Sequence, residues 1–352
     1  MSYLERMTQR ARDLRGRPSV RILAIETSCD ETAASVVKSG RTVLSNFVYS
    51  QIDLHTVYGG VVPEIASRAH VEKIGLVVHA ALDESGLGFD DIDALAVTYG
   101  PGLVGALLVG VSYAKGLAAA LDKPLIPVNH IEGHICANYL SFPELEPPYL
   151  CLVVSGGHSH LIMVDEGDHY RLIGCTQDDA AGEAFDKAAR ILKLPYPGGP
   201  KLDMQAELGD AGLYVLPRPH TDGPYDYSFS GLKTAFINLT HKMGQRGEEL
   251  PVQDLAAAFR KAVVDQLTDK CMLAAAELGQ KRIALAGGVS ANSLLRRQML
   301  AACGQRGIEL FMPKLKYTGD NAAMIGAAAF RRLSHAQVAG LDLNANPSLR
   351  LV

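Results

Sequence analysis

The sequence predicts an α/β protein with two lobes. Segments typical of strands alternate with segments typical of helices, which indicates sheets covered by helices. The 352 residues are more than one hydrophobic core usually serves. Two distant segments, "RILAIETSCDETAASVV" and "YLCLVVSGGHSHLIMV", share one pattern of apolar strand, polar turn and apolar strand. They have negligible sequence identity, so the pattern alone suggests an internal duplication.

Composition indicates a soluble globular protein without a strong attraction to polyanions. Apolar residues make up 48% of the chain, charged residues 20%, and the net charge is −4, so nucleic-acid binding would need a local basic patch or a partner. Six cysteines without a CxxC pair are typical of reduced, cytosolic thiols. The apolar run "LVGALLVGVSYA" is too short to cross a bilayer and predicts a buried helix.

Three segments follow from the pattern along the chain. Residues 1–20 are basic and predict a frayed N-terminal arm. The first lobe is expected over 21–147 plus 320–352, and the second over 148–319. The proline-rich "SFPELEPPYL" marks the boundary between the lobes.

The remaining elements follow from periodicity and from residues typical of helix ends. Pro63 suits the first turn of one helix, and Asp320 would cap the last one. The predicted helices are 62–85, 181–194, 231–243, 253–278, 292–303 and 320–333. Besides the two hairpins, the predicted strands are 93–99, 124–128, 282–286 and 308–313.

Four glycine turns are expected at the carboxyl ends of strands, where open α/β sheets bind ligands. The first, "YGPGLVG", spells GxGxxG with Gly100, Gly102 and Gly105, a motif that suggests a dinucleotide-binding site. Pro101 removes one amide, and no acid ends the next strand, so this interpretation is weak. The sequence has no phosphate-binding GxxxxGK[ST] loop.

The other three turns are "VSGGHS", "YPGGPKLD" and "LAGGVSANSLLR". Amides and the hydroxyl of the first suit phosphate oxygens. Gly287 and Gly288 would let a planar ring approach the backbone, with Asn292 placed to hydrogen-bond it at a helix start. For any one turn alone, ordinary turn chemistry remains the simpler explanation.

A metal site is predicted from "NHIEGH". A helix that starts near Asn129 places His130 and His134 on one face. A third ligand is needed, and Asp320 is the best candidate. The zinc-protease motif HExxH does not fit, because Glu132 would point away from the histidine face. A half-exposed polar helix face remains the alternative for the histidine pair.

Taken together, the motifs resemble the TsaD family, once called O-sialoglycoprotein endopeptidases. The resemblance runs from about Ile22 to residue 335 through "ILAIETSCDETAASVV", "YGGVVPEIASRAH", "GPGLVGALLVG", "NHIEGH", "LVVSGGHSHL", "DDAAGEAFDKAARILKLPYPGGPKLD", "FSGLKTAF", "LAGGVSANSLLR" and "TGDNAAMIG". It implies the fold of actin, sugar kinases and heat-shock chaperones, with two ribonuclease-H-like lobes around a nucleotide cleft. It implies transfer of a threonylcarbamoyl group from threonylcarbamoyl-AMP to the N6 amine of the adenosine 3′ of the anticodon, in tRNAs reading codons that begin with A, with release of AMP.

The resemblance also implies site residues and cofactors. One divalent iron or zinc ion per subunit would be held by His130, His134 and Asp320, and the cleft would take the adenylate donor or ATP/ADP. Asp30 and Glu31 match acidic positions linked to activity. The expected contacts to the donor are Val153, Val154, Ser155, Gly156, Gly157, Asp186, Gly199, Asp203 and Asn292.

Partners and location follow from the resemblance as well. Besides tRNA and threonylcarbamoyl-AMP, a TsaB-like paralogue on the first lobe and a TsaE-like ATPase are expected, in a bacterial cytoplasm and with no membrane. A sugar or acyl kinase of the same fold and a scaffold ATPase remain alternatives, and a metalloprotease is a distant one. Metal content together with a tRNA-modification assay discriminates among them.

Overall fold

The computed structural model describes residues 1–352, which divide into two compact units. Unit 1 comprises Met1–Leu145 and Pro313–Leu351, and unit 2 comprises Glu146–Met312. The first boundary lies within the proline-rich segment. The chain returns to unit 1 at Pro313 rather than at the expected residue 320, because the amide of Lys314 already bonds to Ser141 Oγ at 3.0 Å.

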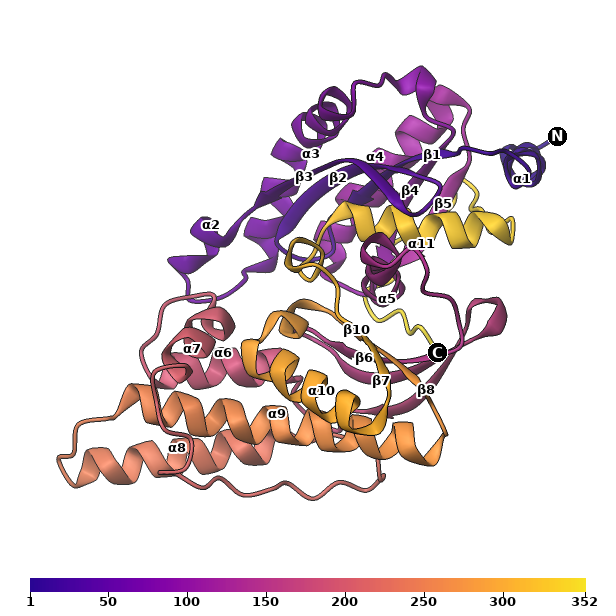
Figure 1. Ribbon diagram of the computed structural model, residues 1–352. Helices are drawn as coiled ribbons and strands as arrows, with labels where there is room; N and C mark the ends of the chain where they lie inside the picture. Colours follow the sequence, from indigo (N-terminus) through magenta and orange to yellow (C-terminus); the bar gives the residue numbers. More distant parts are fainter. The chain divides into compact units, whose positions relative to one another are not determined.

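Unit 1 is built on a five-stranded sheet in the order β3-β2-β1-β4-β5 (Figure 1). The hairpin strands β1 and β2 pair antiparallel, β3 continues the meander, and β4 and β5 run parallel to β1. The strands are β1 Arg21–Glu26, β2 Glu31–Lys38, β3 Thr42–Ser50, β4 Ala94–Gly100 and β5 Leu125–Asn129.

Helices cover both faces of this sheet. Leu23 and Ile25 of β1 share a core with α3 and α4, whereas Ala24, between them, faces α11 through Gly326. This is the alternation expected of a strand buried on both sides. The helices of unit 1 are α1 Tyr3–Leu14, α2 Ile52–Thr56, α3 Pro63–Ser85, α4 Val104–Leu121, α5 His130–Ser141 and α11 Ala322–Ser334.

Helix α4 contains the predicted apolar run. By length and composition alone it could cross a membrane, but one side of it packs on the sheet through Val111, Ala114 and Ala118. Val104 and Leu108, on the other side, are 52% and 41% exposed. The helix is therefore only partly buried, and its exposed apolar side is open to a partner.

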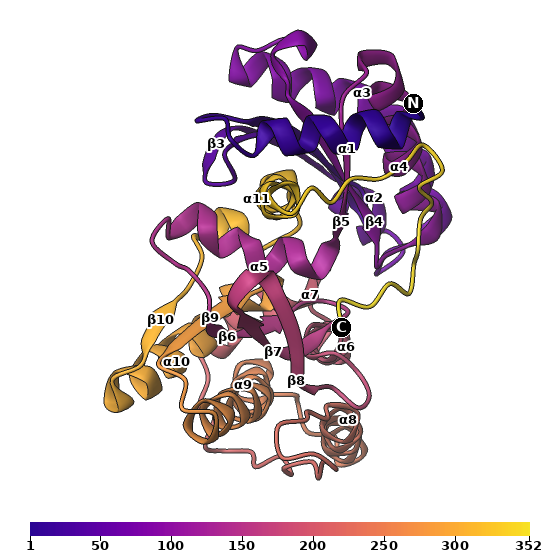
Figure 2. The same cartoon turned by 90° about the vertical axis from the view of Figure 1, so that its right-hand side faces the viewer.

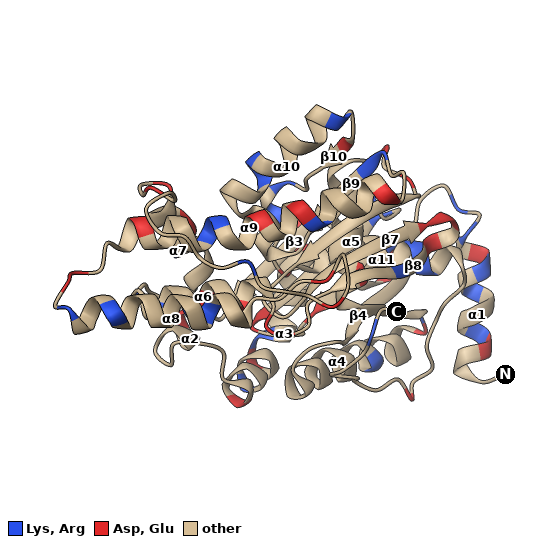
Figure 3. Ribbon diagram, turned by 90° about the horizontal axis from the view of Figure 1, so that it is seen from below, with Lys and Arg blue, Asp and Glu red and all other residues tan.

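The expectation of a frayed N-terminal arm was wrong, because these residues form α1. Ser2 and Glu5 make a reciprocal capping box at its start. Met7, Ala11 and Leu14 are buried on one face. Arg6 and Arg10 both pair with Asp122, so the helix, with both charge signs along it in Figure 3, docks against unit 1.

Unit 2 repeats the sheet topology of unit 1. Its order is β10-β9-β6-β7-β8, with β6, β7 and β8 antiparallel and β9 and β10 parallel to β6. Reading β6 for β1, each strand has its counterpart, as the two hairpins predict. The strands are β6 Tyr149–Val154, β7 Ser159–Asp165, β8 His169–Cys175, β9 Arg282–Ala286 and β10 Glu309–Phe311.

The long helix α9 forms the centre of the helical layer in unit 2, between α10 and α8 (Figures 1 and 2). Phe259, in its first half, packs with Phe185 of α6 and Phe236 of α8. The helices of unit 2 are α6 Ala181–Ile191, α7 Gly198–Ala206, α8 Ser230–Gln245, α9 Val252–Glu277 and α10 Ser293–Arg306.

Four short 3-10 helices complete the fold. In unit 1 they are η1 Phe89–Asp91 and η4 Leu315–Tyr317, and in unit 2 they are η2 Glu166–Asp168 and η3 Gly288–Ala291.

Candidate metal centre and nucleotide cavity

The histidine pair lies at the start of α5, where the sequence predicts it. Asn129 is the N-cap, and its Oδ1 accepts a hydrogen bond from the amide of Ile131 at 2.8 Å. This cap fixes the first helical turn. The rings of His130 and His134 therefore lie on one face, with centroids 4.6 Å apart.

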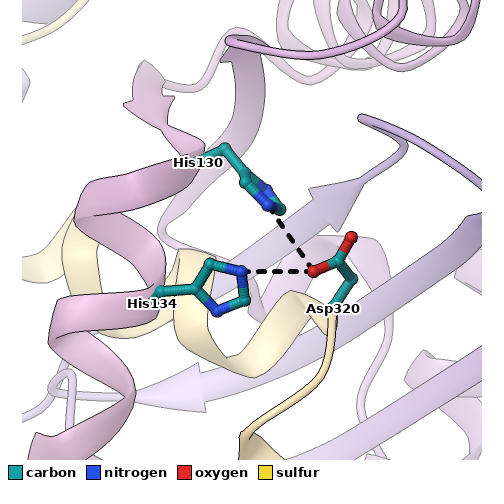
Figure 4. Close-up of side chains that lie close together, drawn as sticks. All are labelled: His130, His134 and Asp320. Atoms are coloured by element: carbon teal, nitrogen blue, oxygen red, sulfur yellow. Dashed lines mark ion pairs between the residues drawn. The ribbon is translucent and has the colours of Figure 1, made fainter. Parts of the chain in front are cut away.

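Asp320 lies opposite the two imidazoles, in the turn before α11 (Figure 4). Its Oδ1 is 3.2 Å from His134 Nε2 and 3.5 Å from His130 Nε2. The alternative that Asp320 caps α11 is wrong. Asn321 is the N-cap, and its side chain accepts from the amide of Met324 at 3.1 Å, which leaves the carboxylate of Asp320 turned toward the histidines.

These three residues fit a divalent metal ion. Their ligand atoms lie within 4.8 Å of one another, and two imidazoles with one carboxylate form a donor set that iron(II) and zinc use. His134 Nε2 is buried and makes no well-aligned hydrogen bond, although Asp320 Oδ1 lies 3.2 Å away. A buried polar atom without a partner is costly, and a bound cation would relieve that cost.

Electrostatics around the group also favour a cation. Burial tends to lower the pKa of His130, but Asp320 and Glu26 outweigh it and raise that pKa to about 9. Burial, Asp320 and Asp30 raise the pKa of Glu31 to about 9. Both shifts arise from negative charge gathered in a partly dry region, which a positive ion would offset.

Asp30 ends the hairpin turn between β1 and β2, and Glu31 is the first residue of β2. Asp30 is buried, and Glu31 Oε1 accepts from Ser50 Oγ at 3.2 Å. His70 of α3 contacts this turn, with its Nε2 2.9 Å from the carbonyl oxygen of Cys29. Ser28 Oγ, in the same turn, lies 3.1 Å from His130 Nδ1, so the turn lies beside the histidine group.

The orientation of Glu132 distinguishes this group from a zinc-protease site. It is buried on α5, and its Oε2 pairs with Arg332 Nε at 2.6 Å. That carboxylate thus faces a cation on α11, away from the two histidines. The prediction that it points off the histidine face is confirmed.

Unit 2 contains a cavity of about 420 Å³, a size typical of small-ligand sites. Three of the four predicted turns meet there through Gly156, Gly199 and Gly288. The sequence analysis missed lining residues on three elements near these turns. They are Gly182 and Phe185 of α6, Pro197, Pro200 and Met204 in or just before α7, and Val289 and Ala291 of η3. The cavity is lined by Gly156, Gly182, Phe185, Asp186, Pro197, Gly199, Pro200, Asp203, Met204, Gly288, Val289, Ala291 and Asn292.

The polar wall of the cavity is held by hydrogen bonds within the protein. Asn292 caps α10, and its Nδ2 donates to Asp203 Oδ1 at 3.0 Å. Asp203 also pairs with the buried Arg260 at 2.8 Å. The turn expected at "YPGGPKLD" is in fact the start of α7, where the amide of Gly199 donates to Asp186 Oδ1 at 3.0 Å.

Four of the residues expected to contact the donor do not line this cavity. Val153 and Val154 are fully buried in β6, so their side chains belong to the core. Ser155 is buried and its carbonyl accepts from the amide of Gly182. Gly157 is exposed and is not among the residues that line the cavity.

The first glycine turn lies in unit 1 and is closed. A Cβ at Gly100 would come within 2.0 Å of the carbonyl oxygen of Asn346, and one at Gly102 within 2.5 Å of that of Ser28. The amide of Gly102 donates to Pro347 O at 3.2 Å. Its glycines therefore serve close packing, Gly100 against the C-terminal segment, Gly102 against Ser28 and Gly105 against Ser67, which argues against the dinucleotide alternative.

Solved structures with this fold are recognisable despite low sequence identity. HypF from T. kodakarensis matches with a TM-score of 0.60 and 15% identity, over 90% of this chain and 48% of that one. Component A of the (R)-2-hydroxyglutaryl-CoA dehydratase of Acidaminococcus fermentans matches with a TM-score of 0.52 and 14% identity, over 90% and 99%. The chain thus has the predicted actin, sugar-kinase and heat-shock-chaperone fold.

Curated relatives are far closer in sequence. Proteins called tRNA N6-adenosine threonylcarbamoyltransferase from Caldicellulosiruptor saccharolyticus and Clostridium perfringens are 54% and 55% identical over 331 residues, which cover 94% of this chain and 98% of each relative. The TsaD family profile, described as tRNA N6-adenosine threonylcarbamoyltransferase, matches residues 42–327. The chain therefore belongs to the TsaD family and is a transferase that modifies tRNA.

Proposed function

We propose that the chain uses threonylcarbamoyl-AMP as the donor and modifies the adenosine 3′ of the anticodon in tRNAs reading codons that begin with A. The N6 nitrogen forms a bond to the carbamoyl carbon and loses a proton, while the bond from that carbon to the phosphate oxygen breaks and AMP leaves with the electron pair. The observation that carries the proposal is the convergence of His130, His134 and Asp320 in a member of this family.

The chemistry explains why an activated donor is needed. The lone pair of an exocyclic adenine amine is delocalised into the ring, so the amine is a weak nucleophile. A mixed anhydride with AMP supplies a good leaving group. The protein then has to bind both substrates, orient them and accept one proton.

The adenylate part of the donor is assigned to the cavity of unit 2. At Gly156 and Gly288 no atom lies within 4 Å of the place that a Cβ would take, so a ligand can lie directly against the backbone there. Asn292 and Asp203 form a fixed polar wall. The same cavity suits ATP or ADP.

A bound iron or zinc ion would supply Lewis acidity to a carbonyl or phosphoryl oxygen. His130, His134 and Asp320 would hold it. With an ion bound to offset the negative charge that raises the pKa of Glu31, Asp30 or Glu31 would accept the proton of the amine, since Asp30 is buried and Glu31 partly buried beside this group. A purely structural role for this turn is the competing explanation.

Partners complete the proposed system. With a net charge of −4, the chain gains tRNA affinity from an assembly, with a TsaB-like paralogue on the exposed side of α3 and α4 and a TsaE-like ATPase. Val71 and Leu76 of α3 are 64% and 66% exposed there. Six free thiols suit a reducing cytoplasm.

The test is His134→Ala in the full chain. Loss of one of three ligands should abolish metal binding and the modified adenosine in added tRNA, while circular dichroism stays unchanged. The matched control is His241→Ala, an exposed histidine of α8, which should keep both. Undiminished transfer by the His134 variant without bound metal would contradict the proposal.

A further inference from the structure

Glu26 is a charged residue at the end of an otherwise apolar central strand. It is the last residue of β1 and is fully buried. Two neighbouring groups fix its carboxylate: the amide of Ser28, in the turn after β1, donates to Oε1 at 2.5 Å, and Thr98 Oγ1 of β4 donates to Oε2 at 2.5 Å. Burying a carboxylate costs several kcal/mol unless it is well paired, so its place in the core needs an explanation.

The third partner of this carboxylate is His130. Glu26 Oε2 lies 3.2 Å from His130 Nδ1, and Ser28 Oγ lies 3.1 Å from the same nitrogen. The other ring nitrogen, Nε2, faces Asp320. An ionised carboxylate only accepts hydrogen bonds, so its contact requires the proton of His130 to sit on Nδ1.

We propose that Glu26 is a positioning residue that fixes the tautomer and ring orientation of His130, so that Nε2 presents its lone pair to a divalent cation. This inference rests on the proposed metal site and names a residue outside its ligand set. Carboxylates that hold a ligand imidazole in this way are a general device of metal sites.

The second histidine shows that this support is specific. His134 Nδ1 is buried without a hydrogen-bond partner, so nothing comparable fixes its tautomer. Of the two imidazoles, only His130 is braced by the sheet. His130 therefore acts as the fixed ligand, and His134 and Asp320 complete the site around it.

The position of Glu26 gives a second reason. Its carboxylate lies 3.2 Å from Nδ1 of His130, whereas Asp320 faces Nε2 on the other side of the ring. Glu26 therefore orients the ring without contact to the ion.

The experiment compares Glu26→Gln with Glu132→Gln in the full-length chain stripped of metal. Both variants replace a buried glutamate near the start of α5. Glu26 contacts His130, whereas Glu132 lies on α5 and pairs with Arg332. Dissociation constants for Zn²⁺ and Co²⁺ are measured by competition with a chromophoric chelator. Glu26→Gln should weaken binding about 10- to 100-fold, whereas Glu132→Gln should lower the melting temperature and leave affinity near that of the wild type.

Equal affinities for wild type and Glu26→Gln would overturn the inference while leaving the metal site standing. So would an equal loss in Glu132→Gln, which would show a general effect of damaged packing. If the wild type binds neither ion, the proposed metal centre fails, and the inference with it.

A second measurement needs no variant and covers the case that Glu26→Gln does not fold. Long-range ¹H–¹⁵N spectra of the Zn²⁺-loaded wild type report which ring nitrogen carries the proton. The inference expects a protonated Nδ1 on His130. A proton on Nε2, with the metal on Nδ1, would overturn it.

Discussion

Residue type alone does not decide what a buried acid does in this protein. Three glutamates of unit 1 show this. Glu132 neutralises Arg332 across two helices, Glu31 follows a turn and is crowded by Asp30 and Asp320, and Glu26 braces His130. In each case the partner sets the role, so that only the spatial arrangement can assign it.

The absence of a single methyl group shapes the cavity of unit 2. A Cβ at Gly182 would lie 2.5 Å from Ser155 O and 2.7 Å from Gly156 Cα. Gly182→Ala should therefore push the Ser155–Gly156 backbone away from α6. We expect a loss of about 1–3 kcal/mol in the free energy of unfolding from overpacking, together with weaker AMP binding, measured by urea denaturation and calorimetry.

The control for that change is Gly244→Ala in α8, where nothing lies within 4 Å of the new Cβ. In open space, alanine favours a helix over glycine by about 1 kcal/mol. This variant should be more stable and should bind AMP normally. A stabilised Gly182→Ala with normal AMP affinity would show that the close approach is not required.

Much of the metal group could be predicted from the sequence. An asparagine followed by histidines four apart predicts a capped helix with two ligands on one face, and His130 and His134 have that arrangement. The role of Asp320 was ambiguous between metal ligand and helix cap, because both acids and asparagine favour helix starts and Asn321 follows it. Glu26 was missed, although a single acid in "RILAIE" was a signal.

At the scale of elements, a buried arginine ties three helices together around the cavity. Arg260 of α9 pairs with Asp203 and with Glu207. Ser293 of α10 donates its amide to Asp203 and its hydroxyl to Glu207, and Arg297 reaches Glu207 at 2.7 Å. The wall of the cavity is therefore set by contacts among α9, α10 and the end of α7, rather than by any one of them.

This cluster makes stability depend on pH. Hydrogen bonds from Arg297, Ser293 and Arg260 lower the pKa of Glu207 from 4.5 to about 2. A carboxyl with a lower pKa in the folded state stabilises the fold above its unfolded pKa, and this contribution is lost as the pH falls. The unfolding free energy should fall between about pH 4.5 and pH 2 less steeply in Glu207→Gln than in the wild type.

Chemical denaturation of both proteins across that pH range measures the difference. Because Glu207 is partly exposed, solvent screens the effect and the change should be modest. Identical pH profiles would show that the ion pairs of Glu207 contribute nothing to stability.

Periodicity predicted most of the helices and strands, and each wrong or missing prediction has a physical cause. The capping box of Ser2 and Glu5 and the spacing of Met7, Ala11 and Leu14 were legible signals for α1, which the high arginine content obscured. Paired glycines in "PGGP" predicted a turn, yet bonds from α6 and α9 stabilise a helix there. Strands β3 and β8 were not predicted, because both have exposed positions rather than continuous apolar runs.

At the scale of the whole molecule, one sheet topology occurs twice with different chemistry attached. Unit 1 carries the metal group and unit 2 the cavity. Helices α3 and α4 of unit 1 expose Val71, Leu76, Val104 and Leu108, so this face is expected to be covered in the working assembly.

We therefore expect Leu76→Glu to prevent binding of a TsaB-like paralogue, measured by sedimentation of the mixed proteins. Because Leu76 is 66% exposed, the melting temperature should not change. The control is Leu300→Glu on α10, where the leucine is 59% exposed. An unaffected complex with Leu76→Glu would exclude this face as the contact.

The discontinuity of unit 1 has a consequence for synthesis. His130 and His134 leave the ribosome long before Asp320, and all of Glu146–Met312 is translated in between. A nascent chain can offer a metal only two imidazoles until its last segment emerges. Capture of the ion with all three ligands is thus a late event, and a polypeptide interrupted within unit 2 would lack a ligand however well its earlier part had folded.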